Sequence, residues 1–575
     1  MKKIILLIAI LLIASCTGTK KNKLKDGIIS SLPESVDFVL AVDSIKDVFD
    51  NLMLSEDSVL GNKFSKWDKR GIEEVNGILG FNYLNIKNWE QTGVDLDKLA
   101  GFSIDVAKID IKKKEYCYNQ NIYDNETGKI TGSDKKCNSY DSQDAIVNFA
   151  LFIPVKDSKL FLKRVNETAK SDFVTISKEK GITKIILGKK TDKYHLATYL
   201  LKRGDYFIWV MTLSDELKID TALSFINSKK SLSDNVSYRV TRKKISTSKG
   251  LYLLANINGF IKKHEAFFNK QLSKSHRGEE KFIISNFIKL FKGYKFVASS
   301  IEFKNPELKV NFFAELTDNS LMKKVYNGVL YDKKYILGIS DKIVSELSIG
   351  ANTNTIYKAI KKTFLKNKLE STVSKISMIS GLNFQKDFID QLAGNFNLGV
   401  YNAETINPMN HNFVASFTVK DSKLFSKTLA KLSDKFNNFM SSKKVGDSIF
   451  YTLTTPMMIK LYFTLKGKSF IFSTSKTYFD KALAVKNIKD GEIFKIVKKN
   501  KVKNSINGDN FFYLDFYELS KVLEIFRINN KIIPKFDSIT ISSSLKNNNF
   551  SGTFLLKVNS EKPFFKFLAE LFGNK

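Results

Sequence analysis

Residues 155–161 read Val-Lys-Asp-Ser-Lys-Leu-Phe, and the same seven residues return in the same order at 419–425. Each copy follows an apolar run, 149–155 or 413–419, and leads into apolar residues at three- and four-residue steps, a spacing typical of an amphipathic helix. Asp157 and Asp421 stand where helix N-caps are expected. The sequence therefore predicts the same strand-to-helix junction twice, with Leu160 and Leu424 at equivalent places on helices that cover a sheet.

Other landmarks keep the same order around both copies. Residues 93–95 and 99–101 precede the first apolar run, as 381–383 and 392–394 precede the second, and Gly204 and Gly467 each head a later apolar run. Residues 308–316 and 550–558 alternate between apolar and mostly polar, which predicts strands with one buried face. We expect an α+β fold of two related units of antiparallel sheet backed by helices, produced by internal duplication. Unit 1 would span residues 31–325, including a cysteine hairpin, and unit 2 residues 336–575.

The N-terminus has the three parts of a secretory signal. Lys2 and Lys3 precede an apolar run from Ile4 to Ile13, and Ala14-Ser15-Cys16 follows. The run has about ten residues, whereas a transmembrane helix needs about twenty, so we expect residues 1–15 to be removed as a signal peptide. No later stretch is apolar enough to span a membrane.

The segment 13–16 resembles the bacterial lipobox, an apolar residue followed by two small residues and cysteine. That resemblance implies cleavage before Cys16 and lipid attachment to its thiol, which would anchor the chain in a membrane of the cell envelope. Residues 16–30 would form the lipid anchor and a short tether. Thr17 is not the aspartate that retains many lipoproteins in the inner membrane, so we expect outer-membrane placement. An ordinary signal peptide that happens to contain a cysteine is the alternative.

The chain is strongly basic, with a formal net charge of +33 over 575 residues. Export removes nucleic acid as a partner, and most of the basic residues are lysines, whereas base and phosphate recognition favours arginine. Two explanations stay open. The charge can reflect the codon bias of an AT-rich genome, or a preference for anionic lipid headgroups or an anionic envelope polymer.

Of the three cysteines, two remain after lipid attachment, Cys117 and Cys137. An exported pair with a turn-forming segment, residues 124–128, between them predicts a disulfide across a hairpin. The Cα atoms should then lie within about 7 Å of each other. Two free thiols, or a metal site formed by the pair, are the alternatives.

A wider resemblance covers residues 31–558. The opening Leu32-Pro33 turn, the strand that ends in Val42-Asp43, and the strand-to-helix step at Asp157 resemble uncharacterised bacterial lipoprotein families, known only as domains of unknown function. The start of the second unit, residues 344–349, lacks the Leu-Pro turn. The resemblance implies no activity, cofactor or catalytic residue.

The known catalytic motifs that this sequence partly matches are incomplete. His264 begins a zincin-like pattern, but Phe268 stands where the second histidine is needed. A cluster of His264, His276, Glu279 and Glu280 could bind a metal, although a solvated helical hairpin is the preferred interpretation. Gly467-Lys468-Ser469 ends like a phosphate loop but fits a β-turn. We therefore expect no catalytic residues, no metal and no cofactor.

The functional hypothesis from sequence is a membrane-anchored, non-enzymatic envelope lipoprotein that acts as a binding or interaction module, with an unknown protein partner. A carrier of a lipid or other hydrophobic ligand is an alternative, because the chain has 47 Phe residues and its sheets would each have an apolar face. An enzyme of unrecognised type is a further alternative.

Overall fold

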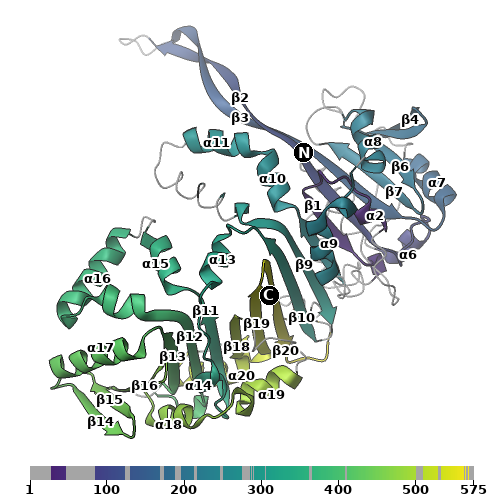
Figure 1. Ribbon diagram of the computed structural model, residues 1–575. Helices are drawn as coiled ribbons and strands as arrows, with labels where there is room; N and C mark the ends of the chain where they lie inside the picture. The colour runs from purple at the N-terminus through teal and green to yellow at the C-terminus, as the bar shows by residue number, and fades with distance from the viewer. Residues whose placement is uncertain are drawn as a thin grey trace. The chain divides into compact units, whose positions relative to one another are not determined.

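The structure, a computed structural model, describes residues 27–46, 85–123, 130–168, 174–187, 196–212, 217–228, 230–245, 250–274, 285, 288, 291–304, 306–361, 366–407, 411–456, 458–499, 509–528, 532–562, 564, 567, 568 and 571. It combines helices with antiparallel strands, so the expected α+β class is confirmed. The chain divides into two compact units (Figure 1). Unit 1 comprises 1–47, 64–239 and 253–288, and unit 2 the rest. The division cuts through α9 (Val236–Ile245) and β8 (Leu251–Ala255).

The sheet of unit 1 is antiparallel. Its strands pair in the order β8, β1 (Phe38–Val42), β2 (Ala100–Tyr123), β3 (Ile130–Pro154), β7 (Tyr206–Thr212), β6 (Leu196–Arg203), β5 (Ile182–Leu187) and β4 (Val174–Glu179). Among the described residues, unit 1 contains the helices α2 (Gly27–Ser30), α6 (Ile86–Glu90), α7 (Ser158–Thr168), α8 (Ile219–Asn227), α10 (Ile257–Lys263) and α11 (Glu265–Lys274).

Two strands of unit 1 continue far beyond its sheet. The β1 ladder on β2 reaches only Ile104, and the β7 ladder on β3 reaches only Asn148. Beyond these residues β2 and β3 pair with each other as far as Tyr123 and Ile130. Residues 105–123 and 130–147 form a two-stranded arm that projects from unit 1 (Figure 1).

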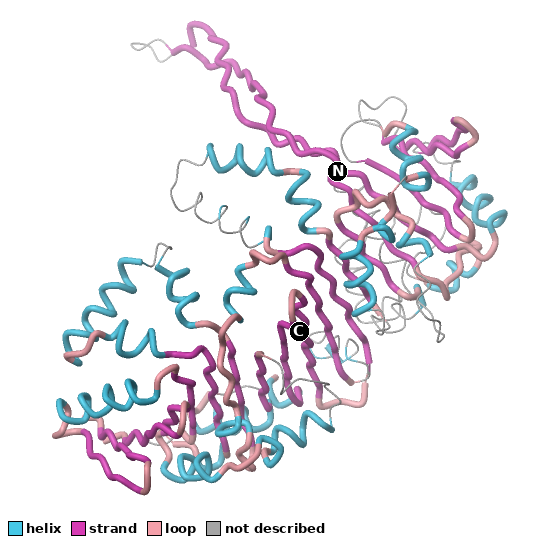
Figure 2. Tube along the Cα trace, in the orientation of Figure 1, coloured by secondary structure: helices cyan, strands magenta, loops and turns pink. Residues whose placement is uncertain are grey.

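The sheet of unit 2 is also antiparallel, and Figure 2 shows its strands side by side. They pair in the order β9 (Tyr294–Lys304), β10 (Glu307–Leu316), β20 (Asn549–Val558), β19 (Phe536–Lys546), β18 (Asn510–Asp515), β11 (Ile343–Gly350), β12 (Leu392–Tyr401), β13 (Phe413–Val419), β17 (Ser469–Ser473), β16 (Lys460–Lys466), β15 (Ser448–Thr454) and β14 (Met440–Val445). From β11 to β14 this order repeats the pattern that runs from β1 to β4 in unit 1.

Helices cover unit 2 in two main clusters. Side chains of α14 (Lys334–Leu337), α18 (Lys476–Ala484) and α19 (Glu492–Lys499) pack with Tyr401, Phe511 and Leu555 on one face of the sheet. On the other face α17 (Ser422–Lys435) packs over Phe463 and Phe470. The remaining helices of unit 2 are α13 (Leu321–Tyr326), α15 (Thr353–Lys361), α16 (Lys366–Ser380) and α20 (Phe516–Ile525).

The repeated heptapeptide adopts the same local structure twice. Asp157 Oδ1 accepts hydrogen bonds from the backbone N–H of Lys159 and Leu160 at 2.9 and 3.0 Å, and Asp421 Oδ1 accepts from Lys423 and Leu424 at the same two distances. Both aspartates are therefore N-caps, as predicted. The next residue along each helix, a phenylalanine, packs on a phenylalanine of the later strand, with ring centroids 4.9 Å apart for Phe161–Phe207 and 5.4 Å for Phe425–Phe470.

Two boundaries differ from the sequence expectation. The sequence predicts that unit 1 extends to residue 325 and therefore contains β9 and β10 (residues 294–316). Instead they belong to the sheet of unit 2, because β10 pairs along its length with β20. The expected tether also ends earlier than residue 30, because Gly27–Ser30 is helical and Ile29 is fully buried.

Candidate functional site

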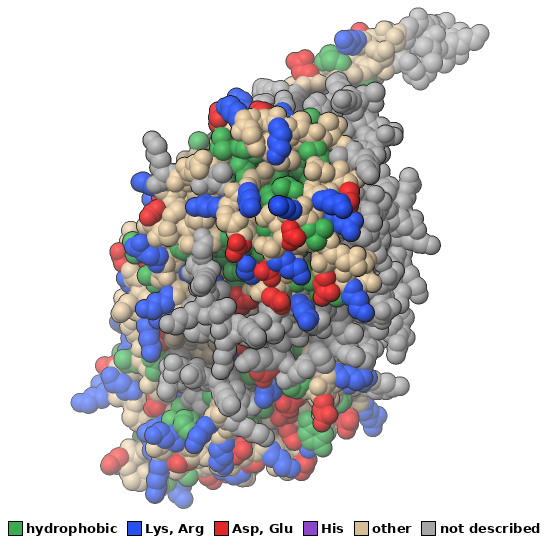
Figure 3. Space-filling view, turned by 90° about the vertical axis from the view of Figure 1, so that its right-hand side faces the viewer, with side chains coloured by type: hydrophobic (Ala, Val, Ile, Leu, Met, Phe, Trp, Pro, Cys, Tyr) green, Lys and Arg blue, Asp and Glu red, His purple; other side chains and the backbone are tan. Residues whose placement is uncertain are grey.

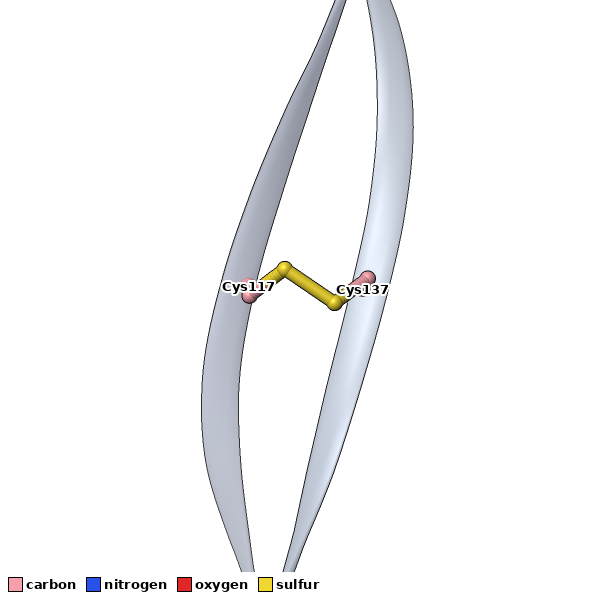
Figure 4. Close-up of a disulfide and its surroundings, with 2 residues drawn as sticks. All are labelled: Cys117 and Cys137. Atoms are coloured by element: carbon pink, nitrogen blue, oxygen red, sulfur yellow. A yellow bond between two sulfur atoms is a disulfide. The ribbon is translucent and has the colours of Figure 1, made fainter.

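The two cysteines of the arm face each other. Cys117 pairs with Cys137 across β2 and β3, their Cα atoms are 4.0 Å apart, and the sulfurs form a disulfide (Figure 4). The predicted distance is confirmed. The neighbouring residues Tyr116 and Tyr118 point to the opposite face of the ribbon, since side chains alternate along a strand. Their rings stack at 5.9 Å and are 61% and 37% exposed.

Most of the other residues singled out from sequence lie in parts of the chain that the structure does not describe. Cys16 and the signal segment 1–15 lie outside the described residues, as do His276, Glu279 and Glu280. His264 ends α10 and is only 3% exposed, so the expected solvated hairpin is wrong at this residue. It packs edge-on against Phe260, because the apolar face of α10 turns inward, and burial lowers its pKa. Gly467 has a φ of +62° between β16 and β17, as the turn requires.

A pocket of about 350 Å³ in unit 2 is lined by Asp341, Glu492, Asp515 and Glu518. Three of these acids are neutralised locally, because Lys481, Lys495 and Lys521 form ion pairs with Asp341, Glu492 and Glu518. The fourth, Asp515, caps α20 by accepting from the backbone N–H of Glu518 at 2.9 Å. Burial raises its pKa. The pocket acids thus stabilise local structure. Among the described residues, no group of three or more His, Cys, Asp or Glu side chains could hold a metal.

The strand register of unit 2 builds a larger feature. One residue from each of seven neighbouring strands lies directly opposite the next, and every one is apolar. This apolar row is Ile301 (β9), Val310 (β10), Phe554 (β20), Ile541 (β19), Phe512 (β18), Leu347 (β11) and Leu398 (β12). All seven side chains are half-buried. At a strand spacing of about 4.8 Å, the row is about 29 Å long.

Flanking residues widen the apolar row. Phe312 lies two residues from Val310 on the same face, and Ile349 and Phe396 lie two residues from Leu347 and Leu398. Ile349 and Phe396 pair directly and are 39% and 37% exposed. Apolar residues also follow Leu398 on the next strands, β13, β17 and β16. There they belong to the hydrophobic cluster beneath α17.

The opposite face of the same strands is mixed, because buried apolar residues such as Phe511 and Leu555 lie there beside buried polar ones. There Ser300, Ser348, Asn397, Thr540 and Ser542 are all buried. A half-solvated antiparallel sheet normally buries its apolar face and exposes its polar one. In the centre of unit 2, the half-buried apolar row therefore lies on the face opposite a largely buried layer of polar and apolar side chains. Contiguous, partly exposed apolar faces are common at interaction sites.

Sequence reasoning missed the apolar row. Its members are separated by up to 253 positions, from Ile301 to Phe554, and no local motif joins them. The available signal was the period-two alternation of each strand, which indicates an apolar face without showing whether a helix covers it.

Comparison with known proteins does not place this chain in a family. No family model matches the chain, and no curated protein matches it. Two solved structures of TP0453, crystal forms III and I, share 12% identity with it. They cover 53% and 52% of this chain and 88% and 81% of TP0453, with TM-scores of 0.25 and 0.24.

Two further observations concern membrane-spanning helices and the distribution of charge. In the described part of the chain no helix is both long and apolar enough to cross a bilayer. On the face shown in Figure 3, Lys and Arg side chains are scattered and Asp and Glu lie among them, rather than gathering into one basic patch.

Proposed function

We propose that the protein is a non-enzymatic, lipid-anchored envelope protein whose unit 2 binds the acyl chain of a lipid along the apolar row. The observation that carries this proposal is the unbroken register of seven half-buried apolar side chains from Ile301 to Leu398. Because the row is about 29 Å long and contains no polar side chain, it fits an extended hydrocarbon chain and offers a compact polar metabolite no hydrogen bond.

The same proposal places the protein at a membrane of the cell envelope. The lipobox-like ending at Cys16 would fix the protein to a membrane, which supplies acyl chains as ligands. The excess of 92 Lys and Arg over 59 Asp and Glu would favour anionic headgroups at that surface. Outer-membrane placement follows from Thr17 as an expectation of the lipobox pattern.

We also propose that the fold arose by internal duplication. Three observations support it: the identical Asp157 and Asp421 caps, the matching Phe161–Phe207 and Phe425–Phe470 contacts, and the strand order β1-β2-β3-β7-β6-β5-β4 that recurs from β11 to β14. Under this proposal β11 is the counterpart of β1, although it lacks the Leu32-Pro33 turn.

A second binding role is favoured by the arm of unit 1. Stacked, exposed tyrosines are typical of protein contact surfaces, because a rigid aromatic ring gives a large contact area at low entropic cost. Tyr116 and Tyr118 provide such a pair on the ribbon face opposite the disulfide. We propose that this face contacts a protein partner in the envelope. Tyr116→Ala with Tyr118→Ala should reduce crosslinking to that partner and leave lipid binding unchanged.

Titration with a fluorescent fatty acid tests the lipid proposal. Wild-type protein, stripped of lipid, should bind the probe, and Phe554→Ser should weaken binding by about 10- to 100-fold. That range corresponds to the loss of about 1.5–3 kcal/mol of aromatic contact. The matched control is Phe439→Ser, because Phe439 is a 52% exposed phenylalanine outside the row. Equal affinities for all three proteins would refute the proposal.

A further inference from the structure

The acid-lined pocket of unit 2 lies where β11 begins and β18 ends. These two strands are antiparallel neighbours, so segment 340–343, which leads into β11, meets the start of α20, which follows β18. Asp515 and Glu518 at that helix start, together with Glu492 and Ile496 of α19, complete the lining. The fold therefore brings three segments that are far apart in sequence around one cavity of about 350 Å³.

One oxygen in the pocket lining has no hydrogen-bond partner in the protein. Glu518 Oε1 accepts from Lys521 Nζ at 3.0 Å, but Glu518 Oε2 is buried and unpaired, in a residue that is only 7% exposed. Buried polar atoms are nearly always paired. Because a carboxylate in an ion pair with lysine can only accept hydrogen bonds, Glu518 Oε2 requires a donor, and the pocket that Glu518 lines has room for one.

The ion pairs around the pocket leave one carboxylate without a lysine. The carboxylates are those of Asp341, Glu404, Glu492, Asp515 and Glu518, and the lysines are Lys342, Lys481, Lys495 and Lys521. Among the described residues no lysine pairs with Asp515, which accepts instead from the backbone N–H of Glu518 and from the Tyr513 hydroxyl. Burial, together with the charges of Asp537 and Glu518, raises the pKa of Asp515. One further positive charge would be stabilised here.

We propose that this pocket binds the ammonium group of a primary alkylamine at Glu518 Oε2, beside Asp515. An ammonium group has three N–H donors and one positive charge, so it supplies both the donor that Glu518 Oε2 lacks and the charge that balances Asp515. The alkyl chain would lie against Ile343 and Ile496, the apolar residues of the lining. The cavity of about 350 Å³ is many times the roughly 30 Å³ share of one water molecule, so an organic ligand fits.

Two other kinds of cation fit the pocket less well. A metal ion needs several ligands that converge on one point, and no group of three or more His, Cys, Asp or Glu side chains in the described part of the chain could hold one. A quaternary ammonium group has no N–H to donate to Glu518 Oε2. It is also recognised by aromatic side chains, and the described lining residues include none. The class of ligand is therefore a primary amine.

Isothermal titration calorimetry of the full chain with n-butylamine hydrochloride at pH 7 tests the proposal. Wild type should bind about one butylammonium per chain. Butan-1-ol has the same hydrocarbon without the charge, and butyltrimethylammonium has the charge without an N–H donor. Both should bind at least about 10-fold more weakly than butylammonium, because each lacks one half of the charged hydrogen bond to Glu518 Oε2.

Two variants locate the binding. Glu518→Gln removes the charged acceptor and should weaken butylammonium binding at least about 10-fold. The matched control Glu524→Gln changes an exposed glutamate further along the same helix and should leave the affinity unchanged. Ile496→Trp fills the pocket and keeps every carboxylate, so it should abolish binding even if Glu518→Gln perturbs folding.

The outcomes separate the proposal from its rivals. If wild type does not bind butylammonium, or if Glu518→Gln and Ile496→Trp bind it as wild type does, water satisfies Glu518 Oε2 and the proposal is wrong. Phe554→Ser, which alters the apolar row, should bind the amine as wild type does. Amine binding at this pocket therefore does not depend on lipid binding, and either proposal can fail without the other.

Discussion

Asn311 faces Thr553 across β10 and β20, and the Thr553 hydroxyl donates to Asn311 Oδ1 at 3.1 Å. In the same antiparallel register, Leu308 lies opposite Leu556 and Ala314 lies opposite Phe550. If residues 308–316 and 550–558 are counterparts, Asn311 is the counterpart of Thr553. A local two-fold axis then passes between them, which accords with the proposed duplication.

If the two junctions are equivalent, their caps should contribute equally to stability. Asp157→Ala and Asp421→Ala each remove two hydrogen bonds from backbone N–H groups, one of 2.9 Å and one of 3.0 Å in both caps. Each should lower the free energy of unfolding by about 1 kcal/mol. Urea denaturation measures the loss, with the exposed Lys423→Ala as control. An effect at only one aspartate would contradict the equivalence.

Buried Glu346 should make unit 2 less stable as the pH rises. Its pKa in the folded protein is about 8, against an ordinary value of 4.5, so between these values the folded state holds a proton that the unfolded state has lost. The free energy of unfolding should therefore fall by up to about 1.4 kcal/mol per pH unit from this group.

Glu346→Gln should remove this slope, because glutamine does not titrate. Denaturant titrations of both proteins at pH 5.5, 6.5 and 7.5, values chosen to fall between the two pKa values, measure it. A slope that is the same in wild type and in Glu346→Gln would show that another group is responsible.

The disulfide should stabilise the arm and little else. It closes a loop of about 20 residues, worth roughly 3 kcal/mol by the chain-entropy model, and an isolated two-stranded ribbon is marginal on its own. Reduction, or Cys117→Ser with Cys137→Ser, should speed amide exchange in residues 105–120 and 133–147, measured by mass spectrometry. Protection in β5, β6 and β7 should be unchanged, and its loss there would show that the arm supports the sheet.

Local features of this fold were predictable and long-range ones were not. The helix junction at Asp157 and the cysteine hairpin depend on residues close in sequence, so short patterns indicated them. The pairing of β10 with β20 could not be predicted, because the alternation of apolar and polar residues gives a strand one apolar face but does not determine which strand lies beside it. The length of the arm was also hidden, since its exposed residues, such as Tyr116 and Asn138, show no apolar face.

The sequence suggested the type of ligand but not the residues that form the candidate site. Abundant phenylalanine suggested a hydrophobic ligand, but the apolar row depends on the pairing of seven strands. The buried side chains of Glu346 and Asn397 also come from strands 51 positions apart. Asparagine and glutamate are ordinary surface residues in a sequence, and only the fold shows that these are buried.

Native mass spectrometry of protein purified from its own envelope, followed by lipid extraction, tests the acyl-chain proposal most directly. Wild type should carry about one lipid per chain, and Phe439→Ser should carry the same. Phe512→Ser combined with Phe554→Ser, which removes two aromatic rings from the apolar row, should carry little or none while unfolding cooperatively. Wild-type protein that carries no lipid and takes none up from vesicles would contradict the account.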